Sequence, residues 1–105
     1  MAEKSIKMKK EAALLAFDSL HLQKPEDANI TYEQLVKILS EELNELIQSD
    51  FNKVLNILYR IDVDEHKISK ALATNPENRS AGIILAELII ERQLQKIYYR
   101  KHFNK

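Results

Sequence analysis

Glycine is almost absent from this chain of 105 residues, which contains Gly82 and, as its prolines, Pro25 and Pro76. Average proteins contain about 7% glycine, and the tight turns of β-sheet proteins depend on glycine and proline. The rest of the sequence is rich in Leu, Ile, Glu, Lys and Gln, which favour helices. We therefore expect an all-α protein, a compact bundle of four to five helices that forms a single domain over residues 1–105.

The first half of the chain predicts three helices. The first runs from about residue 3 to 22 and carries an apolar stripe formed by Ile6, Ala13, Phe17 and Leu20. After a loop over 23–30, Thr31 and Gln34 have the spacing of a capping box, which predicts the start of a second helix. Ser49 or Asp50 caps a third helix, which ends near Arg60. Its expected inward stripe is Phe51, Val54, Leu55 and Leu58.

The segment ILYRIDVDEHK, residues 57–67, gathers a tyrosine, an arginine, three carboxylates and a histidine. We interpret it as a structural corner in which Asp62 is the N-cap of a short fourth helix. Helix dipoles favour acids in a first turn and cations in a last turn, and an ion pair of Arg60 with Asp62 or with a neighbouring helix would complete the corner. The residues of this corner are Arg60, Asp62, Asp64 and Glu65.

Two functional interpretations of this corner compete with the structural one. An EF-hand loop also begins Asp-x-Asp, but it needs glycine at its sixth position and glutamate at its twelfth, where this chain has Lys67 and Ala73. A phosphotransfer module needs an exposed histidine that a phosphoryl group can approach, and three carboxylates surround His66. We therefore expect no metal, no cofactor and no catalysis; an enzyme or phosphotransfer module using Tyr59–His66 is the less favoured alternative.

The last helix is expected to run from near Ser80, after a loop over 73–80, to about His102. Its first half is apolar on nearly all sides, so the helix is either central to the bundle or covered by a second subunit. Val63, Ile68, Ala71 and Leu72 of the fourth helix are expected to face inward.

The end of the last helix combines cations with aromatic residues and, from residue 92 onward, has no acid. The possible interaction surface consists of Arg92, Lys96, Tyr98, Tyr99, Arg100, Lys101 and Phe103, with Lys105 beyond it. Tyrosine and arginine are favoured at protein interfaces, so we expect a protein partner or self-association, as a homo-oligomer such as a homodimer. Contact with nucleic acid through the same residues is the alternative, against which the near-neutral pI of 6.8 argues. In the simplest interpretation, these residues only complete the core and cap the helix.

Charge is unevenly distributed along a chain whose formal net charge is zero. Residues 26–65 carry ten acidic and three basic groups, whereas residues 66–105 carry eight basic and three acidic groups. Attraction between these regions is expected to hold helices together or to bring one molecule onto another. There is no cysteine, and no apolar run is long enough for a secretory signal or a membrane span. We expect a cytoplasmic protein that does not bind membranes.

Two phrases, LNILYRIDVDE (55–65) and LIIERQLQK (88–96), resemble a group of short, uncharacterised bacterial proteins. The resemblance covers roughly the second half of the chain. It implies a small intracellular helical domain and carries no known chemistry. From the sequence, we expect a small non-catalytic helical interaction protein.

Overall fold

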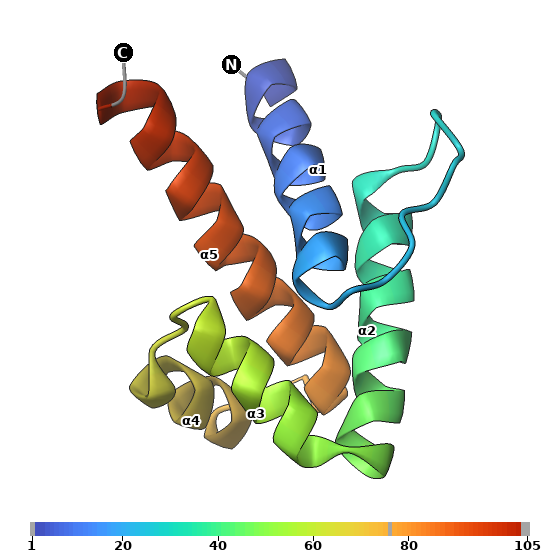
Figure 1. The fold of residues 1–105 in the computed structure, drawn as a ribbon, viewed down its shortest axis with the longest axis vertical. Helices are drawn as coiled ribbons and strands as arrows, with labels where there is room; N and C mark the ends of the chain where they lie inside the picture. The colour runs from blue at the N-terminus through green and yellow to red at the C-terminus, as the bar shows by residue number, and fades with distance from the viewer. Residues whose placement is uncertain (1, 76, 104–105) are drawn as a thin grey trace.

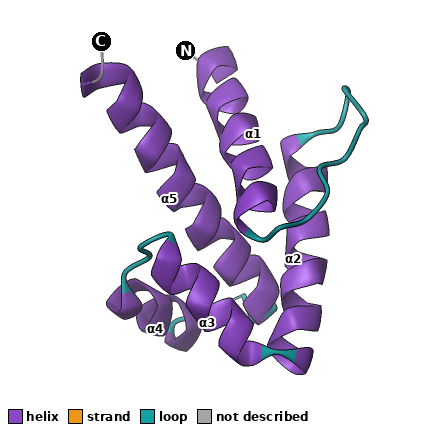
Figure 2. Cartoon of the chain, in the orientation of Figure 1, coloured by secondary structure: helices purple, strands orange, loops and turns teal. Residues whose placement is uncertain are grey.

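Five helices joined by loops make up the described part of the chain, which contains no strand (Figure 2). The structure is a computed structural model that describes residues 2–75 and 77–103, with side chains for 6–75 and 77–102. The helices are α1 (Ala2–Ser19), α2 (Tyr32–Ser49), α3 (Phe51–Arg60), α4 (Glu65–Ala73) and α5 (Ala81–Phe103). The prediction of an all-α fold with a long C-terminal helix is confirmed.

Helix α5 packs mainly against α2 and α1, and it runs antiparallel to both (Figure 1). The short helices α3 and α4 lie at the end of the molecule away from the chain termini. Ile90, in the middle of α5, is only 2% exposed. The apolar part of α5 is therefore internal to one copy, so of the two expected positions it takes the central one.

A buried polar contact joins α1 to α5 within this core. The Gln93 side chain is buried, and its Nε2 donates to the Ser19 hydroxyl at 2.9 Å. The same hydroxyl lies 3.2 Å from the Leu15 carbonyl, to which it donates. Buried polar groups need partners because an unpaired one is costly, and here both side chains have one.

The end of α1 shows how a helix stops without glycine or proline. The Leu22 N–H donates to the Phe17 carbonyl at 2.9 Å, and the His21 N–H donates to the Asp18 carbonyl at 3.0 Å. This pair of bonds is a Schellman motif, in which His21 takes the left-handed position with φ of 58°. Helix α1 consequently ends at Ser19, three residues before the predicted end.

The predicted caps of α2 and α3 are confirmed. The Gln34 N–H donates to the Thr31 hydroxyl at 3.1 Å, and the Thr31 N–H donates to the Gln34 side-chain oxygen at 2.9 Å, which completes the capping box. At the start of α3, the Lys53 N–H donates to Asp50 at 3.2 Å. Each cap satisfies backbone donors that a helix start leaves without a partner.

The single glycine lies where α5 comes closest to α2. A Cβ atom at Gly82 would collide with the Ser40 carbonyl and with the Asn44 side chain. The Gly82 N–H donates to the Asn44 side-chain oxygen at 2.9 Å, while the Asn44 amide donates to the Ser80 hydroxyl at 3.2 Å. A side chain of α2 thus caps the N-terminus of α5 together with Ser80.

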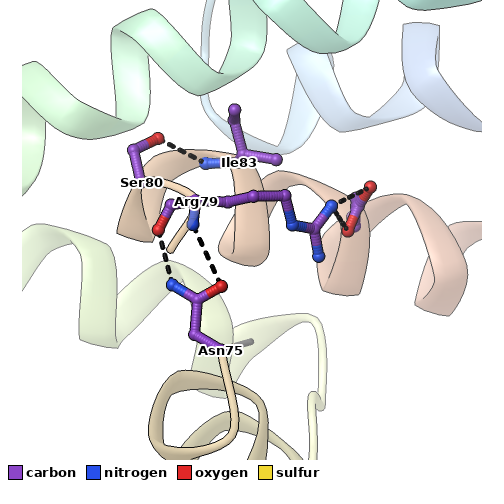
Figure 3. A network of polar contacts seen from close by, with 5 residues as sticks. Asn75, Arg79, Ser80 and Ile83 are labelled. Atoms are coloured by element: carbon purple, nitrogen blue, oxygen red, sulfur yellow. Dashed lines mark hydrogen bonds and ion pairs between the residues drawn. The ribbon is translucent and has the colours of Figure 1, made fainter. Parts of the chain in front are cut away.

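The loop before α5 is closed by side chains of its own (Figure 3). The Asn75 amide donates to the Arg79 carbonyl at 2.6 Å, and the Arg79 N–H donates to Asn75 at 3.0 Å. Ser80 then accepts from the Ile83 N–H at 3.3 Å. Arg79 reaches along α5 and forms an ion pair with Glu87 at 2.9 Å. These contacts therefore fix the direction in which the backbone of the loop enters α5.

Candidate functional site

The corner between α3 and α4 differs from the prediction in the role of Asp62. Asp62 is not the N-cap of α4; it has φ of 65° and closes the end of α3 in a second Schellman motif. The Val63 N–H donates to the Leu58 carbonyl and the Asp62 N–H to the Tyr59 carbonyl, both at 3.1 Å. The N-cap is Asp64, which accepts from the His66 N–H at 2.9 Å. The cap lies later than predicted because α3 uses residues 61–63 to satisfy its own last carbonyls.

Arg92 of α5 holds this corner. Its Nε donates to the Ile61 carbonyl at 3.3 Å, and its guanidinium forms an ion pair with Asp62 at 3.4 Å. The partner of Asp62 is therefore on a neighbouring helix, and Arg60 forms no ion pair with any residue that the structure describes. Arg92, which the sequence placed in the interaction surface, thus contacts the α3–α4 corner.

A groove of about 440 Å³ runs between this corner and α5. Its walls carry charges of both signs, and a second ion pair crosses it, from Lys67 to Glu91 at 2.6 Å. The lining residues are Asp62, Val63, Asp64, Lys67, Leu88, Glu91, Arg92 and Gln95. The charged groups thus connect α4 and the α3–α4 corner to α5 through exposed ion pairs. Within residues 2–75 and 77–103, no three acidic or histidine side chains are grouped to hold a metal ion.

The last turns of α5 present the remaining predicted residues. Tyr98 is 54% exposed and Tyr99 65% exposed, and Arg100 and Lys101 are exposed beside them, whereas Ile97 is buried in the core. Lys96, one turn earlier, is half-buried. The side chain of Phe103 and residue Lys105 lie outside the described part of the chain.

The Tyr98 ring is held by its neighbour one turn on. It stacks on the His102 ring with the ring centroids 4.0 Å apart and an angle of 24° between the planes. The His102 ring nitrogen Nδ1 also lies 3.0 Å from the Tyr98 carbonyl. An exposed aromatic ring is therefore fixed in orientation by contacts within its own helix.

The first turns of α1 lie at the same end of the molecule as the last turns of α5, although the two helices diverge toward the termini (Figure 1). Ile6 lies on the predicted core stripe of α1 yet is 59% exposed, since the core ends before it. Lys7 and Lys9 are exposed as well. Residues 6–10 and 96–102, which we call the basic end, contain six Lys or Arg and no Asp or Glu.

Helix α3 carries another exposed surface, apolar and separate from the basic end, which the sequence interpretation missed. Phe51 and Leu55 were predicted to face inward, but both are exposed and align with Tyr59, which is 85% exposed. The inward residues are Val54, Ile57 and Leu58. A spacing of four, repeated from 51 to 55 to 59, could have revealed a separate stripe. Leu72 of α4, also predicted inward, is exposed, whereas Val63, Ile68 and Ala71 are half-buried.

Two groups have shifted pKa values. Burial, followed by the negative charges of Glu87 and Glu33, raises the pKa of the Tyr32 phenol. The hydrogen bond and the charge of Glu87 raise the pKa of Arg79. Tyr32 lies below Lys9 of the basic end, whose Nζ is 6.0 Å from the centre of the Tyr32 ring. Neither Tyr32 nor Arg79 lines the groove at the α3–α4 corner.

Comparisons with family models, with curated proteins and with solved structures give no match to this chain. The resemblance of residues 55–65 and 88–96 to short bacterial proteins therefore stays a prediction. None of the described helices has the length and apolarity that a membrane span requires.

Proposed function

We propose that this protein is a small non-catalytic interaction protein that binds a protein partner, or another copy of itself, through the end of α5. The observation that supports this most is the exposure of Tyr98 and Tyr99, at 54% and 65%, beside Arg100 and Lys101. Tyrosine and arginine are enriched among residues that dominate binding energy at protein interfaces. Two tyrosines exposed between cations have the composition of such a site.

The way in which α5 is held also supports the proposal. Ile90 and Ile97 anchor α5 in the core, so its last turns extend from a fixed support. Stacking on His102 restricts the Tyr98 ring before any partner arrives. Binding loses less conformational entropy when side chains are ordered in advance. The end of α5 is therefore a preorganised surface.

Nucleic acid is the alternative partner for the same residues. Bases bind by stacking on free aromatic faces, and one face of Tyr98 is already covered by His102. This favours a protein partner. Nuclease treatment distinguishes the two, because it removes only capture that depends on nucleic acid.

The test compares what two variants of the full-length protein capture from an extract of the cells that make it. Arg100→Glu with Lys101→Glu changes the charge at the end of α5, and Lys53→Glu with Lys70→Glu makes the same charge change on α3 and α4. We expect the first pair to lose protein partners that wild type and the second pair retain. Equal capture by all three proteins, or capture that nuclease removes, would contradict the proposal.

A further inference from the structure

We propose that the basic end docks on a second copy of this chain, in an acidic groove beside α2. This inference rests on the proposed function and names the partner. The observations behind it are the composition of the groove, the composition of the basic end, and the position of the two surfaces on the molecule.

The groove lies between the α1–α2 loop and α2 and has a volume of about 360 Å³. It is lined by Asp27, Ile30, Gln34, Lys37, Ile38 and Glu41. Ile30 and Ile38 supply apolar surface, while Asp27 and Glu41 are exposed carboxylates. Glu45 extends the acidic side by one helical turn. Lys37 also lines the groove, so its border holds two carboxylates and one ammonium group, and with Glu45 the charge around the apolar surface is predominantly negative.

The basic end has the complementary composition. Tyr98, Tyr99 and Ile6 supply exposed apolar surface, and Arg100 and Lys101 supply positive charge. Opposite charges around an apolar contact favour one orientation of two proteins and disfavour others. Because the formal net charge of the chain is zero, like-charge repulsion between whole molecules does not oppose their approach.

The end of α5, which carries Arg100 and Lys101, cannot reach the groove within one molecule, whereas Lys9 and Lys10 of α1 already lie near Tyr32 and the Ala28 carbonyl of their own chain. Helix α1 lies between the end of α5 and α2 with its preceding loop (Figure 1). A contact between two different surfaces of identical copies is heterologous, and it forms open chains unless its rotation closes a ring. We therefore expect an average mass that rises with protein concentration, beyond twice the chain mass unless two copies close reciprocally, each with its end in the groove of the other.

The association should be weak and sensitive to salt. Exposed ion pairs contribute about 0.2–1 kcal/mol each, and salt at 1 M reduces the screening length to about 3 Å. Reversing two charges on either surface replaces attraction by repulsion, so we expect affinity to fall by at least about tenfold. The apolar contact alone is not expected to maintain the association.

Light scattering on the intact protein, across concentration and at low and high salt, tests the proposal with two variants. One is Arg100→Glu with Lys101→Glu; the other is Glu41→Lys with Glu45→Lys. Each variant alone should associate more weakly than wild type, because the reversed charges place like charges opposite one another where the end of α5 meets the groove. Their equimolar mixture should associate more strongly than either variant alone, since opposite charges at positions 100 and 101 and at positions 41 and 45 then face each other in both possible contacts.

Three results would overturn the proposal: a wild-type monomer under all conditions, association that neither variant weakens, or a mixture that associates no more strongly than either variant alone. Circular dichroism of each variant verifies its fold. If Arg100→Glu with Lys101→Glu unfolds, Arg100→Gln with Lys101→Gln takes its place. A monomeric wild type whose capture of another protein still depends on Arg100 and Lys101 would reject the second copy as partner. That result would leave the proposed function standing, so the two failures are distinguishable.

Discussion

The side-chain oxygen of Asn44 on α2 accepts a hydrogen bond from the backbone N–H of Gly82 on α5 at 2.9 Å. The surroundings of this bond explain why the chain's only glycine occupies position 82. The first turn of α5 lies so close to α2 that a Cβ at Gly82 would overlap the Ser40 carbonyl and Asn44. A side chain on α2 then supplies a cap that α5 would otherwise need from its own sequence.

Replacing Gly82 by alanine should therefore destabilise the protein. Alanine in place of glycine inside a helix is ordinarily stabilising by about 1 kcal/mol, whereas overpacking typically costs about 1–3 kcal/mol. We expect Gly82→Ala to lower the free energy of unfolding, as measured by urea denaturation. Combining it with Asn44→Ala should be less harmful than the sum of the two changes, because the smaller side chain removes part of the overlap. Greater stability for Gly82→Ala would show that the helices are farther apart.

Substitutions at Asp62 and Asp64 should have opposite effects. Asp64→Ala removes the N-cap of α4 and should cost about 1 kcal/mol of unfolding free energy. Asp62→Gly places the preferred residue at a left-handed C-terminal position, and the lost pair with Arg92 is exposed and contributes little. We expect Asp62→Gly to be neutral or stabilising in the same urea experiment. A loss of stability for Asp62→Gly as large as that for Asp64→Ala would contradict this division of roles.

A buried acid at position 90 should prevent folding. Ile90 is 2% exposed on the central helix, and an unpaired carboxylate there would lose its hydration. We expect Ile90→Glu to lose its helical circular dichroism signal. The matched change Gln95→Glu, on the exposed side of the same helix, should remain folded. A folded, monomeric Ile90→Glu protein, where wild type associates, would mean that this surface is an interface between copies.

The raised pKa of Tyr32 predicts a loss of stability in alkali. The native state holds the phenolic proton more tightly than the unfolded chain, whose phenol titrates at about 10. The stabilising contribution is therefore complete below about pH 10 and disappears as pH rises through the higher native pKa. We expect the unfolding free energy of wild type to fall relative to Tyr32→Phe as the pH rises above about 10. Parallel pH profiles for the two proteins would be evidence against the shift.

Much of the fold could be predicted from local sequence signals. Near absence of glycine indicated helices, and Thr31 with Gln34 marked the start of α2 because a capping box involves only neighbouring residues. The prediction failed where two local motifs compete for the same residues. Asp62 fits an N-cap by spacing, but α3 uses it to close its own end. Which motif forms depends on the packing of both helices.

The contacts and exposure of individual side chains were harder to predict than the helices and their caps. Arg92 is a cation on the same helix as Arg100, and only the tertiary arrangement shows that it contacts the Ile61 carbonyl. Likewise, Phe51 and Leu55 match an inward helical pattern, yet α3 buries the neighbouring stripe. A periodic pattern identifies apolar faces, but it does not show which neighbouring helix covers them.

The most direct test of the proposed surface is photo-crosslinking in the cells that make the protein. A photoreactive residue, p-benzoylphenylalanine, would replace Tyr99 on α5, Tyr59 on α3 or Ser69 on α4, all exposed positions. We predict crosslinks to protein from position 99, including crosslinks to residues 26–45 of a second copy, and none from position 69. Crosslinks to protein from position 59 alone, or only to nucleic acid from position 99, would contradict a protein-binding surface at the end of α5.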